Sequence, residues 1–545
     1  MAYTTGGQQV IILKEGTQRS RNREARSRNI TVAMIVAEAL KTTLGPRGMD
    51  KMLVDSLGDI TITNDGFTIL DEMDLEHPIG KMIKEAAKTQ QDTVGDGCTT
   101  ATILTGELLK KASELLDQDI HPTVIISGFR KAVARALEVL EETGVEVDLG
   151  DRETLRKVAR TSMSSKTIGG AAEHFAEIAI DAVRQVAEKR GDEDYVDKDN
   201  IQIVKKEGRG LAETELIRGI VLDKEVIHTG MPKKIEGAKI ALVNTAIEVE
   251  KTEFDAEIRI RDPTHIKAFL DQEADMLKKM VDKVTNSGAN VLLCQKGVDD
   301  VAQQLLAKAG VLAVRRVKES DMENLSKATG AEVVTSLEDL RAEDLGWAGV
   351  VEERKIGDDK MVFVEDCKEP TAVSILIRAG LERMMEEAER AMDDAISVVA
   401  DVYRTPRIVA GGGAVEAELA RQLRGYAVKI GGREQLAIEA FSDALEVVPR
   451  TLVENAGHDV LDSTVALRAA HEKEGGPYMG VDVYSGDVVD MRERGVLDPA
   501  KVKEQALKTA TELASMILRI DDVIAATKPK EEAGPPGMGE EEEEF

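Results

Sequence analysis

The segment 95–100, Gly95-Asp96-Gly97-Cys98-Thr99-Thr100, separates two long stretches with the apolar spacing of helices, 79–91 and 99–116. Its two glycines allow the backbone to fold so that successive N–H groups converge on an anion. The threonines add hydroxyl groups at the start of a helix, where the helix dipole favours phosphate, and Asp96 offers an oxygen ligand to Mg²⁺. The alternative is an ordinary Asp-Gly turn with threonine capping the helix. The hexapeptide alone leaves both interpretations open.

Three further glycine loops have a similar composition. Leu44-Gly45-Pro46-Arg47-Gly48 follows a helical pattern, Asn64-Asp65-Gly66 follows alternating apolar and polar residues, and Ala410-Gly411-Gly412-Gly413-Ala414 precedes a second helical pattern. Each one alone is also typical of a plain turn. Four such loops in one chain, two of them with acids, indicate a site for phosphate and a metal ion. The sequence contains no Walker, dinucleotide, zinc-protease or nucleophile-elbow motif, so such a site would need a different loop.

The composition excludes several classes of protein. A chain of 545 residues is too long for one hydrophobic core and predicts roughly three or four domains. The excess of 101 acidic over 72 basic residues argues against a duplex nucleic-acid partner. Cys98, Cys294 and Cys367 form no CxxC pair, so we expect reduced, mostly buried thiols. No signal-peptide or membrane-span pattern is evident, and we therefore expect a cytoplasmic protein without a membrane partner.

The pattern along the first two thirds of the chain changes once. Up to about residue 150 it is helical, apart from a predicted hairpin at 59–70 in which Asn64-Asp65-Gly66 forms the turn. Between about 220 and 370, strand-like runs alternate with helical ones, which suggests a domain with a parallel sheet. Inside this region, 253–286 is a long charged insertion with helical spacing.

The last third returns to helix. From residue 371 the apolar spacing is helical, with one helix predicted over 435–454 and another over 499–520. The Pro-, Gly- and Glu-rich end, 528–545, is expected to be a disordered tail.

The glycine loops and their flanks resemble one family in content and order. The strings Thr43-Leu44-Gly45-Pro46-Arg47-Gly48-Met49-Asp50-Lys51-Met52-Leu53, Thr63-Asn64-Asp65-Gly66, Gly95-Asp96-Gly97 and Gly411-Gly412-Gly413 are similar to those of the chaperonins, and the similarity spans essentially the whole chain. The chain looks most like group II, the archaeal thermosome and its eukaryotic cytosolic relatives. Ser162-Met163-Ser164-Ser165-Lys166 matches a group II segment, and the insertion 253–286 matches the helical protrusion that serves group II as a built-in lid.

The resemblance implies an α+β multidomain chaperonin fold with nested domains. The domains would be a mostly helical equatorial domain (1–150 and 407–527), a small intermediate domain (151–220 and 371–406), an α/β apical domain (221–370) with its lid protrusion at about 253–286, and the acidic tail 528–545.

The resemblance also implies a site for Mg-ATP. Asp96 would bind Mg²⁺. Leu44, Gly45 and Pro46 would lie at the nucleotide and its α-phosphate. Residues 97–100 would lie at the β- and γ-phosphates. Gly412, Asp482, Val483 and Asp498 would lie at the nucleoside. The complete implied set is Leu44, Gly45, Pro46, Asp65, Gly66, Gly97, Cys98, Thr99, Thr100, Ser164, Ser165, Lys166, Gly412, Asp482, Val483 and Asp498.

Three of the implied residues would carry ATP hydrolysis. The family places a water-activating acid immediately before Ala395, which selects Asp394 over Asp393, a position where relatives often have His. Asp65 stands where the family has an acid close to the attacking water, and Lys166 would sense the γ-phosphate. Without the resemblance, Asp393 and Asp394 would be assigned to a solvated helix face, Asp65 to a plain turn, and Lys166 to the surface after a Ser-rich turn. Phosphoryl transfer needs mainly positioning and charge neutralisation, which carboxylate, metal and lysine can supply.

Cys98 departs from the family, whose members commonly have Thr at this position. A thiol is a weaker hydrogen-bond donor than a hydroxyl group. We expect hydrolysis to survive, because Thr99 and Thr100 remain. A thiol beside phosphate-binding N–H groups is also expected to have a lowered pKa and to be prone to oxidation.

The implied function is that of a molecular chaperone with ATPase activity, which folds non-native polypeptides inside a double-ring chamber. The built-in lid would make a separate co-chaperonin unnecessary. Partners would be client polypeptides and identical or paralogous subunits, with roughly eight per ring typical of this branch. Clients would bind apolar patches, and Val301, Leu305 and Leu306 are candidates, with core packing as the alternative. A small-molecule kinase, a purely structural ring protein and a holdase without turnover are rival functions.

Overall fold

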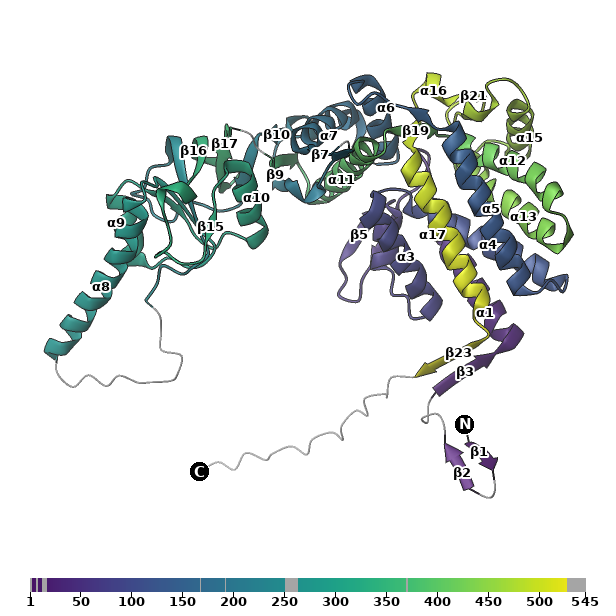
Figure 1. Cartoon of the computed structure of the whole chain (residues 1–545), viewed down its shortest axis with the longest axis horizontal. Helices are drawn as coiled ribbons and strands as arrows, with labels where there is room; N and C mark the ends of the chain where they lie inside the picture. The colour runs from purple at the N-terminus through teal and green to yellow at the C-terminus, as the bar shows by residue number, and fades with distance from the viewer. Residues whose placement is uncertain are drawn as a thin grey trace, which may run out of the picture.

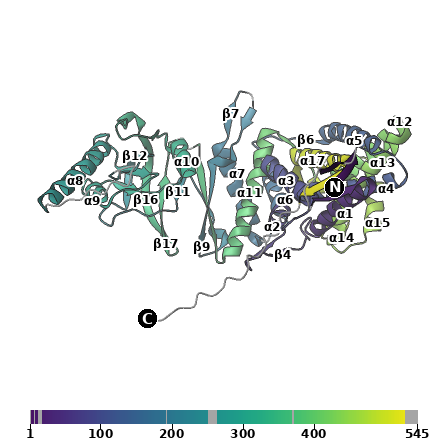
Figure 2. The same ribbon diagram turned by 90° about the horizontal axis from the view of Figure 1, so that it is seen from below.

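The computed structural model describes residues 2–5, 8–11, 17–166, 168–191, 193–249, 263–368 and 371–526. The chain forms an elongated molecule of three consecutive bodies, each with its own large hydrophobic cluster (Figure 1). We call them the helical body, with buried residues mainly from 30–140 and 409–518, the middle body, mainly from 155–201 and 373–408, and the sheet body, from 220–372. The middle body lies between the other two (Figure 2).

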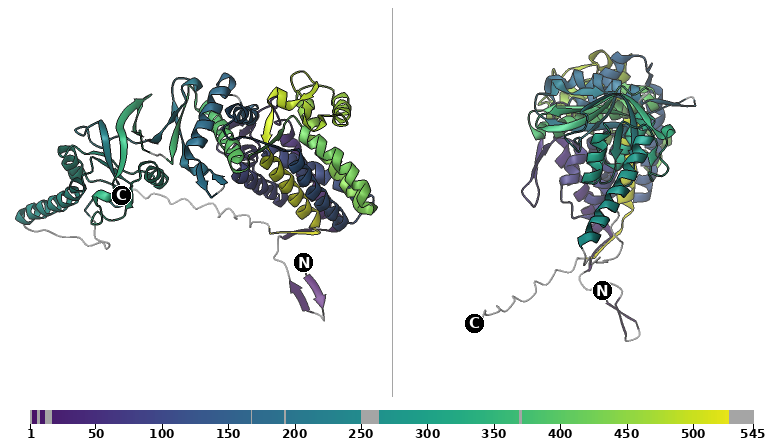
Figure 3. Two further views of the ribbon diagram at one scale, coloured as in Figure 1. Left: turned by 45° about the horizontal axis from the view of Figure 1, so that its top comes forward. Right: turned by 90° about the vertical axis from the view of Figure 1, so that its left-hand side faces the viewer.

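Both ends of the chain build the helical body, where purple N-terminal and yellow C-terminal segments lie together (Figure 3). Its helices are α1 (Asn22–Lys41), α2 (Gly66–Glu72), α3 (Pro78–Val94), α4 (Cys98–Asp117), α5 (Pro122–Thr143), α12 (Ala414–Ile430), α13 (Gly432–Leu445), α14 (Val447–Asn455), α15 (Val460–His471), α16 (Met491–Arg494) and α17 (Ala500–Arg519).

Short sheets join distant parts of this body. β4 (Lys51–Val54) pairs with β5 (Ile60–Thr63), β3 (Thr17–Arg21) with β23 (Asp522–Ala526), β20 (Met479–Val481) with β21 (Val488–Asp490), and β19 (Arg407–Ala410) lies between β22 (Leu497–Pro499) and β6 (Val145–Glu146). β1 (Ala2–Thr5) pairs with β2 (Gln8–Ile11). The pairs β3–β23 and β6–β19 join strands that are hundreds of residues apart in sequence, so the helical body is complete only when both chain ends are in place.

The middle body packs three helices against a small sheet. The helices are α6 (Arg152–Met163), α7 (Ala172–Val186) and α11 (Glu382–Arg404), and the sheet has the order β10 (Glu215–Ile217), β18 (Val373–Ala379), β9 (Ile201–Glu207). β18 is parallel to β9 and antiparallel to β10. A hairpin of β7 (Glu188–Arg190) and β8 (Glu193–Tyr195) completes this body.

The sheet body is built on a mixed sheet with its helices around it (Figures 1 and 2). The strand order is β11 (Gly219–Leu222), β17 (Asp359–Glu365), β16 (Gly346–Ile356), β12 (Lys234–Val243), β13 (Val291–Cys294), β14 (Leu312–Val314), with β15 (Val333–Val334) beside β12. The helices are α8 (Pro263–Asn286), α9 (Asp300–Lys308) and α10 (Glu319–Thr329). Strands β12, β13 and β14 are mutually parallel and apolar along their shared length, as expected for strands covered on both faces.

The α+β class is confirmed, and most predicted helices are present within a few residues. The predicted helix over 435–454 is wrong, because the chain breaks at Glu446 into α13 and α14. Glu446 is buried at this junction, where its carboxylate accepts hydrogen bonds from Arg424, Arg450 and Arg468. The sheet of the 220–370 region is only partly parallel, since β16 and β17 form a long antiparallel hairpin and β16 pairs antiparallel with β12.

The predicted hairpin at 59–70 is also wrong. The strand 60–63 pairs instead with the preceding strand β4. Asp65 is the N-cap of α2: its Oδ2 accepts a hydrogen bond from the Thr68 N–H at 2.8 Å. An N-cap carboxylate of this kind starts a helix because it satisfies an N–H group that has no partner within the helix.

Two sequence-based expectations fall outside the described residues, and a third is corrected by the structure. The predicted tail 528–545 and the first part of the charged insertion, up to residue 262, lie outside the described residues. Leu306 is fully buried in the sheet body, so its inclusion in a client-binding patch is wrong, whereas Val301 on the same helix is 42% exposed. Within the described residues, no helix combines the length and the apolar character that crossing a membrane requires.

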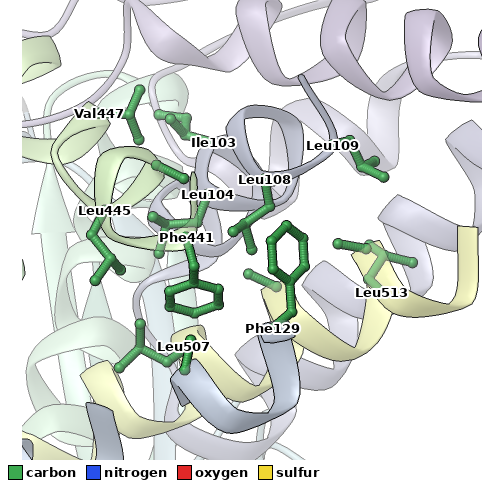
Figure 4. Packing of buried hydrophobic residues seen from close by; sticks show 14 of the residues in the cluster. Ile103, Leu104, Leu108, Leu109, Phe129, Phe441, Leu445, Val447, Leu507 and Leu513 are labelled. Carbon is green, nitrogen blue, oxygen red and sulfur yellow. The ribbon is translucent and has the colours of Figure 1, made fainter. Parts of the chain in front are cut away.

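The core of the helical body depends on large side chains from distant helices. Phe129 of α5 and Phe441 of α13 meet edge to face, with 5.6 Å between ring centroids, among leucines of α4 and α17 (Figure 4). Both rings are almost completely buried. This contact therefore connects the N-terminal and C-terminal parts of the body.

We expect Phe129→Ala to destabilise the helical body by about 3–5 kcal/mol, because it removes a buried ring and leaves a cavity. The measurement is the midpoint of guanidinium unfolding followed by far-ultraviolet circular dichroism. Val428→Ala is the control, since Val428 is 69% exposed and its truncation should change stability by less than about 0.5 kcal/mol. An equal midpoint for Phe129→Ala and the wild-type chain would contradict the role given to this contact.

Candidate functional site

A cavity of about 430 Å³ lies between the helical body and the middle body. This volume is in the range of small-molecule sites, roughly 300–1,000 Å³. Every residue of the predicted site lines it, from both bodies: Leu44, Gly45, Pro46, Asp65, Gly66, Asp96, Gly97, Cys98, Thr99, Thr100, Ser164, Ser165, Lys166, Asp394, Gly412, Asp482, Val483 and Asp498. The structure thus brings together segments that are more than 400 residues apart in sequence.

Two helices begin at the cavity with an uncapped first turn. The N-cap residues are Gly97 for α4 and Gly413 for α12, both with left-handed φ angles, 84° and 76°. Neither helix has a side-chain cap, so N–H groups of the first turn remain available to a ligand. Such helix starts are favourable places for phosphate.

Glycine is required where backbone segments meet at the cavity. A Cβ atom on Gly66 would lie 2.3 Å from Thr99 Oγ1, and one on Gly95 would lie 2.1 Å from the Cβ of Ser397. The first approach places the start of α2 against the first turn of α4. The second places the end of α3 against α11, and therefore joins the helical body to the middle body.

Lys166 is a cation that lies between two acids of the cavity lining, Asp65 and Asp394. Its ammonium group lies 3.2 Å from Asp65 Oδ1 and 3.3 Å from Asp394 Oδ2, and its side chain is only 4% exposed. Burial alone would lower the pKa of Lys166, but the charges of Asp394 and Asp65 outweigh burial and raise it above the ordinary value. Lys166 is therefore charged and bridges an acid of the helical body to an acid of its own body.

The two acids that flank Lys166 differ in the direction of their pKa shifts. Burial would raise the pKa of Asp65, but Lys166 and the hydrogen bonds from Thr68 lower it below the ordinary value. Burial raises the pKa of Asp394 well above the ordinary value, since Lys166 compensates only in part and the charges of Asp65 and Asp96 add to the effect. When the pKa of an acid is raised, its carboxylate form is a stronger base and accepts a proton more readily.

Asp96 lacks an ion pair among the described residues. Burial, together with the charge of Asp498, raises the pKa of Asp96 to about 6. A bound divalent cation would offset both causes. Within the described residues, no group of three or more His, Cys, Asp or Glu side chains is arranged to hold a metal. Mg²⁺ commonly takes one or two carboxylates and completes its coordination with phosphate oxygens and water.

A further polar group of the lining is open to a ligand. Asn64 donates a hydrogen bond from Nδ2 to the carbonyl of Ser165, and its buried Oδ1 has no partner within the described part of the chain. Such orphaned atoms are uncommon unless a ligand or water completes them. This acceptor can bind a group or water that donates a hydrogen bond, or a cation, but not a bare phosphate oxygen, which is itself an acceptor.

The lining also contains the predicted nucleoside residues Asp482, Val483 and Asp498. Asp482 Oδ2 pairs with Arg494 at 3.1 Å, and its Oδ1 accepts a hydrogen bond from the Tyr484 N–H at 2.9 Å. Asp498 Oδ2 lies 3.0 Å from the ammonium group of Lys503. Of the two neighbouring acids on α11, Asp394 lines the cavity, and Asp393 is not part of its lining.

The sequence analysis missed several polar residues of the lining: Asn64, Gln91, Arg160, Tyr484, Arg494 and Lys503. One of them carries a signal in the sequence. Lys503 falls on the apolar stripe of α17, between the buried Val502 and Ala506. A charge on the buried face of a helix needs a partner.

The expectation of a reactive Cys98 is wrong. Burial, together with the charges of Asp65, Asp96 and Asp394, raises the pKa of the Cys98 thiol well above its ordinary value. The sulfur lies 3.2 Å from Gln91 Oε1 and 3.4 Å from the carbonyl oxygen of Ala87, both on α3. The thiol therefore packs against α3, and the contribution of this residue to a ligand would come from its backbone N–H.

We expect all three cysteines to resist alkylation by iodoacetamide at pH 8 in the folded chain. Each is a buried free thiol, and burial raises the pKa of Cys294 and of Cys367 to about 11. The reagent needs the thiolate, which is scarce below the pKa. Mass spectrometry should find three modified cysteines only after denaturation, and rapid modification of native Cys98 would contradict the result.

Comparison with known proteins identifies the family of the chain. The model of the TCP-1/cpn60 chaperonin family matches residues 36–528. A thermosome subunit of Methanopyrus kandleri is 59% identical over 527 residues, which cover 96% of each chain. Thermosome subunit alpha of Archaeoglobus fulgidus is 57% identical over 543 residues, 99% of each chain, and thermosome subunit beta of Thermococcus kodakarensis is 58% identical over 536 residues, 98% of each. The chain belongs to the TCP-1/cpn60 chaperonin family.

Proposed function

We propose that the chain is an ATP-hydrolysing subunit of a ring-shaped chamber in which non-native proteins fold. The observation that carries this proposal is the cavity between the helical and middle bodies, which gathers phosphate-loop glycines, two uncapped helix starts and five acids. Family membership supplies the chaperone activity, and the cavity supplies a place where nucleotide can act on two bodies at once.

The residues of the cavity have complementary roles in this proposal. N–H groups of the first turn of α4, with the hydroxyls of Thr99 and Thr100, bind phosphate oxygens. Asp96 would hold Mg²⁺, which would supply charge neutralisation at the phosphates. Lys166 neutralises the transferred phosphoryl group, and Asp65 fixes Lys166 through the ion pair of 3.2 Å.

Asp394 is the base in the proposed reaction. A water molecule attacks the γ-phosphorus, the bond to the bridging oxygen breaks, and the carboxylate of Asp394 accepts the proton of the water. The raised pKa of Asp394 supports this role, because a stronger base takes the proton more readily.

The position of the site couples hydrolysis to movement. Lys166 and Asp394 belong to the middle body, while Asp65 and Asp96 belong to the helical body. The Lys166–Asp65 ion pair and the hydrogen bond from Asn64 to Ser165 both cross this boundary. Nucleotide charge in the cavity therefore changes what holds the two bodies together, which is how we propose that hydrolysis reaches the chamber.

The finer architecture is part of the same proposal. We assign the helical, middle and sheet bodies to the equatorial, intermediate and apical domains, with the boundaries 1–150 and 407–527, 151–220 and 371–406, and 221–370. The insertion around α8 would serve as the lid, which makes a separate co-chaperonin unnecessary, and each of two rings would hold roughly eight subunits. The exposed Val301 of α9 is one apolar residue that a client can reach. Three free cysteines suit a reducing compartment, the cytoplasm.

Two measurements together test the proposal: the particle size by light scattering and the ATP-dependent refolding of a denatured enzyme. We expect a large ring particle that refolds the enzyme only with Mg-ATP. A monomer without ATPase activity would refute the proposal. A phosphorylated small molecule would indicate a kinase, and protection that is independent of ATP would indicate a holdase.

We expect Asp394→Asn to slow ATP hydrolysis by about 10²-fold or more, because general-base catalysis contributes about 10²–10⁴. ADP binding should remain, since the phosphate loops are intact. Asp393→Asn is the matched control, with the same chemical change one residue away and outside the cavity lining, and its rate should stay within about twofold of the wild type. Steady-state phosphate release measures both, and a larger loss in Asp393→Asn would reassign the base.

A further inference from the structure

A second lysine of the cavity wall has no role in the reaction described above. Lys503 of α17 lies 3.0 Å from Asp498 Oδ2 and 3.0 Å from Glu416 Oε1, and its side chain is 14% exposed. Burial alone would lower the pKa of Lys503, but Asp498 and Glu416 outweigh burial and hold it above the ordinary value. The ammonium group is therefore a fixed charge between two carboxylates.

Glu416 is an unusual partner for such a lysine. It lies in the first turn of α12, directly after the glycine loop 411–413, and is 3% exposed. Its Oε2 atom is buried and has no hydrogen-bond partner within the described residues. A small cavity beside it, of about 10 Å³, is lined by Thr100, Glu416 and Lys503 among others. A half-satisfied buried carboxylate is costly, so Glu416 depends on Lys503 for its charge compensation.

In the chain of contacts from Glu416 through Lys503 to Asp498, the last residue, Asp498, lines the cavity of about 430 Å³. It lies on β22, opposite Val409 of β19, the strand that leads into the glycine loop. The N–H of Gly411 donates to the carbonyl of Val496 at 3.0 Å, and a Cβ atom on Gly411 would lie 3.4 Å from Asp498 Oδ2. The glycine loop, the start of α12 and β22 therefore form one continuous wall on the nucleoside side of the cavity.

We propose that Lys503 is a positioning residue of the nucleotide site, which holds Asp498 toward the cavity and ties it to Glu416 at the start of α12. Lys503 acts through Asp498 and the glycine loop. It sets the affinity of the site for nucleotide, while the reaction step depends on Lys166 and Asp394. This inference rests on the proposed nucleotide function of the cavity.

The test compares Lys503→Met with Lys508→Met in the full assembled chain. Lys508 lies on the same helix, its side chain is 40% exposed, and it pairs with Glu504. We expect Lys503→Met to raise both the Kd of ADP, measured by calorimetry with Mg²⁺ present, and the KM for ATP by about tenfold, the effect of losing one charge-fixed contact. The kcat should stay within about twofold, and Lys508→Met should match the wild type in all three quantities.

Glu416→Gln provides a second, milder variant in case Lys503→Met does not fold. It leaves the ion pair of Lys503 with Asp498 but weakens the tie to α12, and we expect the Kd of ADP to rise about threefold.

Three results would overturn the inference: an unchanged Kd in Lys503→Met, a lowered kcat with unchanged KM, or an unchanged Kd in Glu416→Gln when Lys503→Met does not fold. A purely structural ion pair would lower the unfolding midpoint and leave the Kd of ADP as in the wild type. A wild-type chain that binds no ADP would instead refute the proposed function itself, so the two failures are distinguishable.

Discussion

Repulsion among five carboxylates that face one cavity is the constraint on which the site depends. Asp65, Asp96, Asp394, Asp482 and Asp498 are brought together from distant segments, and like charges repel strongly where water is excluded. Asp482 pairs with Arg494. Two lysines compensate, each lying between two acids: Lys166 between Asp65 and Asp394, and Lys503 between Asp498 and Glu416. Asp96 is left without an ion pair in the described part of the chain. A cation would therefore bind most favourably at this carboxylate.

The two lysines differ in what they are attached to. Lys503 and both of its partners belong to the helical body, so this compensation is built into one rigid core. Lys166 comes from the middle body and reaches Asp65 across the boundary. The ion pairs of Lys503 therefore stay within one body. The ion pair of Lys166 with Asp65 depends on how the two bodies are docked. A site of this design responds to movement of the bodies, and the bodies respond to charge in the site.

The sequence allowed prediction of what depends on short stretches. The glycine loops and most helices follow from local spacing, and the family resemblance supplied Asp394, which lies within the cavity lining. The contacts of Glu416 and Lys503, 87 positions apart, could not be read from local pattern. Cys98 was misjudged for the same reason, since Asp65 and Asp394, which raise its pKa, come from other segments. Asp65 was misassigned to a turn because N-caps and turns favour the same residues.

The origin of the helical body from both chain ends has a consequence for biosynthesis. The strands and helices between Gly219 and Glu365 form a continuous stretch with its own core, so this part can fold on the ribosome as soon as it emerges. Helix α17, which packs against α4 and α5, is among the last segments to be translated. It follows Asp498 directly and carries Lys503. A nascent chain thus contains the loops 44–48 and 95–100 early, but Asp498 and Lys503 join the cavity only after β22 and α17 have been made, so the cavity is incomplete in a chain that stops before α17.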